Sequence, residues 1–113
     1  MLPQKNRLKK RKEFAYIHKN GKKINEQHLS IIYIKSKLPI PKIGISVSNK
    51  VGNAVKRNKV KRQLREIMRS NLPFLRNHQN IVLSAHPNIS ECDFSSLRTE
   101  IEKLLIKGNL KNE

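Results

Sequence analysis

The residues with the most evident chemistry lie in the segment 50–65, where seven of the sixteen side chains are cationic and none is acidic. Its apolar residues follow the helical repeat, as the spacing of Val60 and Leu64 shows. A neighbouring stripe of cations, also spaced by four, consists of Arg57, Lys61 and Arg65. Like charges at this spacing destabilise a helix. The segment therefore predicts a helix that packs on a core by one side and presents cations to a polyanion on another.

These side chains suit RNA in particular. Arginine donates a forked pair of hydrogen bonds to phosphate oxygens, and lysine offers a point charge. Asn58 could hydrogen-bond a phosphate, a ribose hydroxyl or a metal-bound water. A merely solvated basic face is the alternative, but the dense stripe without interleaved acids favours binding. The candidate RNA-binding residues are Lys50, Asn53, Lys56, Arg57, Asn58, Lys59, Lys61, Arg62 and Arg65.

Two aromatic residues are candidates for stacking a base, which is typical of single-strand recognition. They are Phe14 and Tyr33, and each could instead belong to the core.

Groups that could catalyse a reaction are scarce. The histidines, which are His18, His28, His78 and His86, do not have the spacing of a zinc-protease motif. Asp93 is the only aspartate, and it is better explained as a helix cap. We therefore assign no catalytic residue and expect any catalytic groups to be supplied by another molecule.

The composition limits the class of protein. Lys plus Arg number 25 against 8 Asp plus Glu, a net charge of +17 that favours anionic partners, nucleic acid before a membrane surface. No apolar run approaches the ~20 residues that span a bilayer. The N-terminus lacks the apolar stretch of a signal peptide, and Cys92 is the only cysteine. We expect a cytoplasmic protein without a membrane partner.

The patterns predict one α+β domain, 1–113, in which helices pack on a small, mainly antiparallel mixed sheet. Its parts are a basic arm over 1–11, either a solvated tail or a nucleic-acid contact, a folded core over 12–107 and a tail over 108–113. The order is helix, two or three strands, helix, strand, helix. The expected helices are 12–20, 54–71 and 93–107, and the expected strands are 24–35, 43–48 and 81–83.

The strand over 43–48 alternates strictly. Its apolar side chains point to one face and its small residues, which include Gly44 and Ser46, to the other. The face with the small residues is predicted to be exposed or closely approached by another part of the molecule.

The segment 52–66 resembles the signature of the bacterial ribonuclease P protein subunit. The family pattern, an Arg-Asn-Arg core followed by Lys-Arg and then Arg-Glu or Arg-Gln, is similar to Arg57-Asn58-Lys59, Lys61-Arg62 and Arg65-Glu66. The strand before it resembles the family's strand, and the N-terminal matches are Arg7-Leu8, Phe14 and Gly21. The resemblance spans roughly 5–106.

The resemblance implies a fold similar to a ribosomal-protein domain, with a left-handed crossover between parallel strands. It implies the protein subunit of an endoribonuclease whose catalytic RNA removes the 5′ leader of precursor tRNA. The partners would be ribonuclease P RNA and precursor tRNA, and Mg²⁺ would be held mainly by the RNA. The protein is expected to be a monomer within the ribonucleoprotein.

The resemblance also implies residue roles. The motif helix would contact the catalytic RNA, and Asn58 would help to organise a nearby RNA-bound Mg²⁺. The leader would lie in a cleft between the first helix and the sheet, at Phe14, His18, Tyr33 and Arg7. Lys59 replaces a usual arginine, and His18 replaces a frequent aromatic residue. The alternative functions are a structural RNA-binding protein, such as a ribosomal protein, and a DNA-binding architectural protein.

Overall fold

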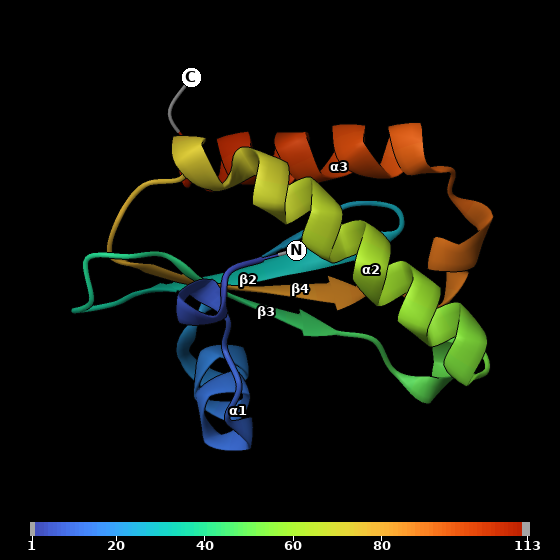
Figure 1. The fold of residues 1–113 in the computed structure, drawn as a ribbon, viewed down its shortest axis with the longest axis horizontal. Coiled ribbons are helices and arrows are strands. Elements are labelled where there is room, and N and C mark those ends of the chain that lie inside the picture. The colour runs from blue at the N-terminus through green and yellow to red at the C-terminus, as the bar shows by residue number, and fades with distance from the viewer. Residues whose placement is uncertain (1, 112–113) are drawn as a thin grey trace.

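The computed structural model describes residues 2–111, which form a four-stranded sheet with helices on both faces. The first helix crosses one face of the sheet, and the other two helices cover the opposite face (Figure 1). This arrangement confirms the predicted α+β class. The helices are α1 (Arg11–Asn20), α2 (Ala54–Asn71) and α3 (Phe94–Lys107), and the strands are β1 (Lys22–Asn25), β2 (Leu29–Lys35), β3 (Lys42–Ser46) and β4 (Gln79–Ala85).

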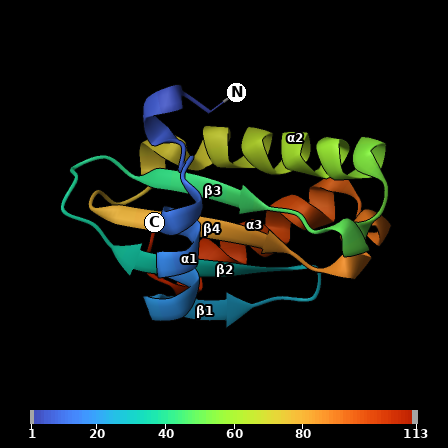
Figure 2. The same cartoon turned by 90° about the horizontal axis from the view of Figure 1, so that it is seen from below.

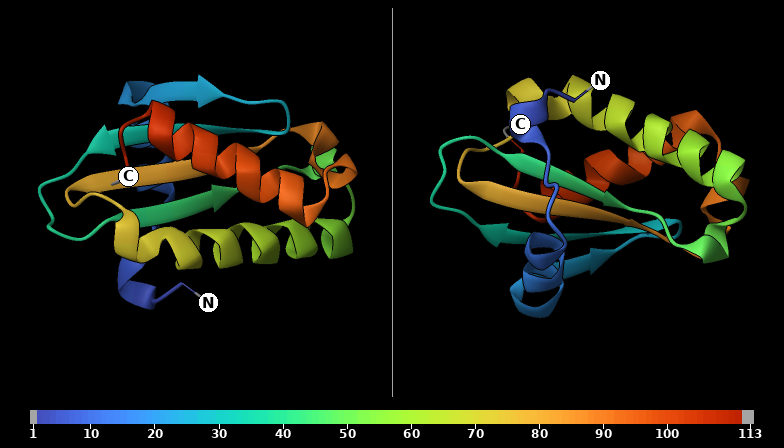
Figure 3. Two further views of the ribbon diagram at one scale, coloured as in Figure 1. Left: turned by 90° about the horizontal axis from the view of Figure 1, so that it is seen from above. Right: turned by 60° about the horizontal axis from the view of Figure 1, so that its bottom comes forward.

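The strand order is β1-β2-β4-β3, with β3 at an edge of the sheet. β2 pairs with β1 and β4 in antiparallel fashion, whereas β3 and β4 are parallel and are joined through α2. With the helices toward the viewer and β3 running from left to right, β4 lies above β3 (Figure 3, left). The chain leaves β3, passes through α2 in front of the sheet and enters β4 above β3. This path is a left-handed crossover. The expected exception to the right-handed rule is therefore present.

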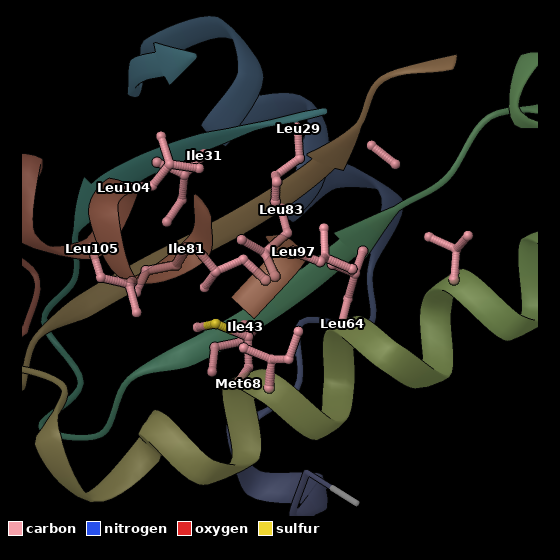
Figure 4. Packing of buried hydrophobic residues seen from close by; sticks show 14 of the residues in the cluster. Leu29, Ile31, Ile43, Leu64, Met68, Ile81, Leu83, Leu97, Leu104 and Leu105 are labelled. Atoms are coloured by element: carbon pink, nitrogen blue, oxygen red, sulfur yellow. The ribbon is translucent and has the colours of Figure 1, made fainter. Parts of the chain in front are cut away.

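The main core lies between the sheet and the helices α2 and α3 (Figure 4). The amphipathic repeat of each helix supplies one side of it, and the alternate residues of each strand supply the other. A smaller cluster lies beneath α1 and consists of Leu8, Ile17, Ile32 and Val82, with Phe14 and Ile34 packed against it. The sheet is thus covered by α2 and α3 on one face and by α1 over part of the other.

One expected strand is divided in two. The segment 24–35 forms the end of β1 and the whole of β2, which pair as a hairpin. The backbone N–H of Glu26 donates to the carbonyl of Leu29 at 2.9 Å and closes the turn between them. The polar residues of this turn interrupt the apolar pattern, and the hairpin satisfies backbone groups that a single long edge strand would leave unpaired.

The described part of the basic arm is packed against the fold. Leu2 and Leu8 are buried, and the backbone N–H of Leu8 donates to the carbonyl of Ile43 at 2.9 Å. The Asn6 side chain donates to the carbonyl of Pro41 at 2.8 Å. The arm therefore follows the start of β3 and passes around this edge of the sheet, with Leu2 in the main core and Leu8 in the cluster on the opposite face.

The end of the chain also contacts the core. Leu110 is buried, and its carbonyl accepts a hydrogen bond from the backbone N–H of Arg76 at 2.8 Å. Residues 112–113 of the expected tail, and residue 1 of the arm, lie outside the described residues. In the part of the chain that is described, no helix is long and apolar enough to cross a membrane.

Candidate nucleic-acid interface

The segment 47–53, called here the connector, joins β3 to α2 and holds the start of that helix. The side-chain oxygen of Asn53 accepts a hydrogen bond from the backbone N–H of Lys56 at 3.0 Å and caps the helix. Gly52 before it has φ 151°, a conformation that residues with a side chain rarely adopt. Asn53 was predicted as an RNA contact, and its oxygen is engaged in this cap. The connector therefore sets the direction in which the basic helix leaves the sheet.

The cations of α2 fall into two groups. Arg57, Lys61 and Arg65 are half-buried beside the apolar stripe, and the Arg57 guanidinium donates to the carbonyl of Gly52 at 3.0 Å. The exposed group extends around the outer side of the helix, and Lys50 is exposed in the connector. The exposed predicted residues of the helix are Lys56, Asn58, Lys59 and Arg62. The structure thus gathers the predicted RNA-binding residues on one helix and its connector.

Within residues 2–111, the only ion pair formed by a cation of α2 joins Arg69 to Glu66 at 2.9 Å. The hydrogen bond from Arg69, followed by its positive charge, lowers the pKa of Glu66. Lys56 and Arg57 lie in the first turn, where the helix dipole already presents positive charge. Repulsion among these positive charges lowers the stability of the free protein, and a bound polyanion would offset that repulsion.

A second surface lies on the opposite side of the sheet, where α1 crosses it (Figure 2). The ring of Phe14 is half-buried and covers Gly44 of β3, a position at which a β-carbon would lie 2.6 Å from two ring carbons. Ile34 of β2 lies against the same cluster. The prediction that the small-residue face of this strand is closely approached is confirmed, and the approaching group is an aromatic ring.

The registers of the strands place a row of small polar residues next to this ring. The row, called here the polar row, consists of Asn25, Ser30, Ser84 and Ser46, which are opposite one another on adjacent strands. The Ser30 hydroxyl hydrogen-bonds the Asn25 side-chain oxygen, and it lies 2.6 Å from Nε2 of His86. Together, Phe14, Ile34 and the polar row form the surface called here the α1 face. Only Phe14 and the Gly44–Ser46 alternation could be identified from the sequence, since the rest depends on strand register.

The other predicted leader-binding residues are scattered. Tyr33 points away from Phe14, because the alternation of β2 turns Ile32 and Ile34 toward α1 and packs Tyr33 with the core beneath α3. The expectation that both aromatic residues serve one surface is therefore corrected. Arg7 is half-buried, and its Nε donates to the carbonyl of Leu2 at 2.9 Å.

His18 is exposed on α1, one turn after Phe14. Its place on the helix leaves the imidazole accessible to a ligand that lies along α1. A role for it in leader binding stays a prediction.

The two surfaces meet at the β3 edge of the sheet. α2 lies along β3 on one side of the sheet and α1 crosses the other side (Figure 2). The arm passes around this edge, with Leu2 in the main core and Leu8 in the cluster beneath α1. Both surfaces therefore lie beside the edge at which the arm pairs with Ile43. The arrangement suits binding of RNA, and Asn58 alone offers too few oxygen atoms to hold Mg²⁺, which takes near-octahedral oxygen coordination.

Comparisons with known proteins agree on one family. The family model described as Ribonuclease P matches residues 2–108. The ribonuclease P protein component of Caldanaerobacter subterraneus is 39% identical over 107 residues, covering 95% of this chain and 92% of the relative. That of Syntrophus aciditrophicus is 35% identical over 106 residues, covering 94% and 89%.

Solved structures give the same result. The ribonuclease P protein of Staphylococcus aureus superposes with a TM-score of 0.88 at 28% identity, covering 95% of this chain and 98% of that one. The protein from Thermotoga maritima gives 0.82 at 32% identity, covering 89% and 96%. The similarity therefore extends over nearly the whole fold.

Proposed function

The chain belongs to the ribonuclease P protein family, and on that premise we propose that it binds the ribonuclease P RNA through α2 and the 5′ leader of precursor tRNA through the α1 face. Its function is that of the protein component of ribonuclease P. The proposal thus names the two partner RNAs and assigns each to its own surface of the protein. It also holds that the protein subunit is a monomer and is cytoplasmic.

The observation that carries the proposal is the composition of α2. Its cations outnumber its single acid, Glu66, and that acid is already paired with Arg69. Lys56 and Arg57 occupy the positive end of the helix, where a bound phosphate backbone is favoured. A densely charged RNA satisfies these groups, and release of its counterions adds to the affinity.

The α1 face is the better candidate for single-stranded leader RNA. Phe14 offers a ring for stacking, and Asn25, Ser46 and Ser84 of the polar row offer amide and hydroxyl groups that can donate to or accept from bases and ribose. Ser30 is buried, and its hydroxyl is engaged with Asn25 and His86. Base stacking on aromatic rings tolerates different sequences. This tolerance suits a leader that differs from one precursor tRNA to another.

In this proposal the catalytic RNA carries out the cleavage, with Mg²⁺ held mainly by the RNA. The protein contributes positive charge near the scissile strand and positions the leader. Asn58 would hydrogen-bond an RNA-bound metal water, since its amide lies among the cations of α2. None of these roles requires a general base or a nucleophile from the protein.

The test is cleavage of a precursor tRNA by the cognate ribonuclease P RNA at low Mg²⁺, with and without the protein. We expect the protein to switch on cleavage at the mature 5′ end. A protein with Arg57 and Arg62 both replaced by alanine serves as the matched control and should fail to do so at the same concentration. Tight RNA binding without any effect on cleavage would instead support a structural RNA-binding role.

A further inference from the structure

A cluster of potential metal ligands lies beside α3, and none of its residues is a proposed RNA contact. Cys92 also lines a hollow with Lys56 and Lys59 of α2. His28 comes from the turn between β1 and β2, Cys92 follows the 3-10 segment Pro87–Glu91, and Glu100 is on α3. One ligand atom from each residue lies within 4.8 Å of the others. Three separate parts of the chain therefore bring an imidazole, a thiol and a carboxylate to one place.

We propose that His28, Cys92 and Glu100 bind a single zinc ion, with a water molecule as the fourth ligand. Zinc accepts nitrogen, sulfur and oxygen donors in tetrahedral sites, whereas Mg²⁺ prefers oxygen donors. A thiolate and a carboxylate together balance the charge of Zn²⁺. The occupied site would be neutral, which matters in a chain of net charge +17.

The carboxylate is already oriented for this role. Oε1 of Glu100 accepts a hydrogen bond from the backbone N–H of His28 at 2.9 Å. This contact leaves Oε2 facing the imidazole Nδ1 of His28 at 2.5 Å and the Cys92 sulfur at 3.6 Å. The side chains of His28 and Glu100 are only 13% and 11% exposed, so the donors are largely shielded from competing water.

The distances show what must move. Zinc bonds of about 2.0–2.3 Å place tetrahedral donor atoms roughly 3.3–3.8 Å apart. The sulfur and Oε2 already have this separation, at 3.6 Å. The contact of Nδ1 with Oε2, at 2.5 Å, must open by about 1 Å. Zinc would therefore displace the proton from Nδ1 of His28, which the neutral imidazole would carry on Nε2 instead, and the thiol proton of Cys92 would go to solvent.

Binding would join α3 to the hairpin turn and to the segment that precedes the helix. These elements are otherwise held by apolar contacts, by the hydrogen bonds of Glu100 and by the ion pair of Lys107 with Glu26 at 3.0 Å. The expected consequence is structural, because an ion that binds only the folded chain stabilises it. None of the three ligands is a proposed RNA contact, and the test measures metal binding and thermal stability without relying on ribonuclease activity.

The experiment uses the full chain, freed of metal by a chelator and kept reduced, and titrates it with Co²⁺ as a spectroscopic substitute for zinc. We expect a thiolate-to-cobalt charge-transfer band that saturates at a single cobalt per chain and disappears when Zn²⁺ is added. C92S and H28Q should lose the band. H78N is the matched control, since His78 is exposed and asparagine tolerates its φ of 61°; it should keep the band.

Thermal unfolding gives a second readout that does not depend on cobalt. Zn²⁺ should raise the melting temperature of the wild-type protein and of H78N, and leave that of C92S unchanged. Circular dichroism establishes that each variant is folded before the titration. A missing charge-transfer band in the wild type, or a band that survives in C92S, would overturn the site and leave a hydrogen-bonded cluster in its place.

Discussion

The ring of Phe14 rests on Gly44 so closely that a β-carbon at position 44 would lie 2.6 Å from two ring carbons. Phe14 is on α1 and Gly44 on the edge strand β3, so this contact fixes the distance of the helix from the sheet. Glycine is needed here for the close approach of the ring, since an alanine would displace it. The position of the proposed stacking ring thus depends on a residue that has no side chain of its own.

Replacing Phe14 by alanine should weaken binding of precursor tRNA while leaving binding of mature tRNA nearly unchanged. Loss of one stacked base corresponds to about 1–3 kcal/mol. Y16A is the control, because Tyr16 lies on the same helix and is 60% exposed. Dissociation constants of the holoenzyme for the two RNAs measure the effect. An equal loss for both would remove Phe14 from the leader site.

G44A should reduce leader-dependent affinity through the ring and not through a contact of its own. In the background of F14A, the same change should therefore have little further effect, since the ring that it displaces is absent. A double-mutant cycle on precursor tRNA binding measures this coupling. Additive losses would mean that the backbone at position 44 contacts RNA directly.

R62A should weaken assembly with the catalytic RNA by about 1–3 kcal/mol, as expected for a hydrogen bond to a charged group. Its side chain is exposed and free of the connector, whereas Arg57 also donates to the Gly52 carbonyl. The slope of log affinity against log salt should fall by about one for each phosphate that the variant no longer neutralises. R76A, an exposed change outside α2, should alter neither quantity. A slope that is unchanged in R62A would place Arg62 outside the RNA contact.

E66Q should have the opposite effect and tighten RNA binding. The change frees Arg69, which Glu66 holds at 2.9 Å, and removes the only negative charge on α2. We expect a steeper salt dependence than in the wild type. Because Arg69 lowers the pKa of Glu66, the pair persists below the ordinary pH range of glutamate and is lost only as the pH falls through that lowered pKa. The two proteins should therefore differ at neutral pH and become alike only in more acidic solution; identical binding at neutral pH would show that Arg69 does not face RNA.

Features that depend on neighbouring residues could be predicted from the sequence. The observed bounds of α2, Ala54–Asn71, match the prediction, because apolar periodicity and the proline that follows act over a few turns. Asp93 caps α3 by accepting from the backbone N–H of Ser96 at 2.7 Å, as its place before the apolar stripe indicated. The basic segment and its family signature are likewise local, so they were sufficient to identify the family.

Contacts between distant segments required the tertiary structure. Strand register decided that Tyr33 turns to the core beneath α3 while Ile34 faces α1, and it aligned Ser30 with Ser84 in the polar row. Packing of Leu8 against the small cluster ordered an arm that composition alone described as a charge run. The approach of His28 to Glu100, which are 72 residues apart, likewise depends on the path of the chain. Local periodicity specifies which face of an element is apolar, but only the pairing and packing of elements decide which side chains meet across them.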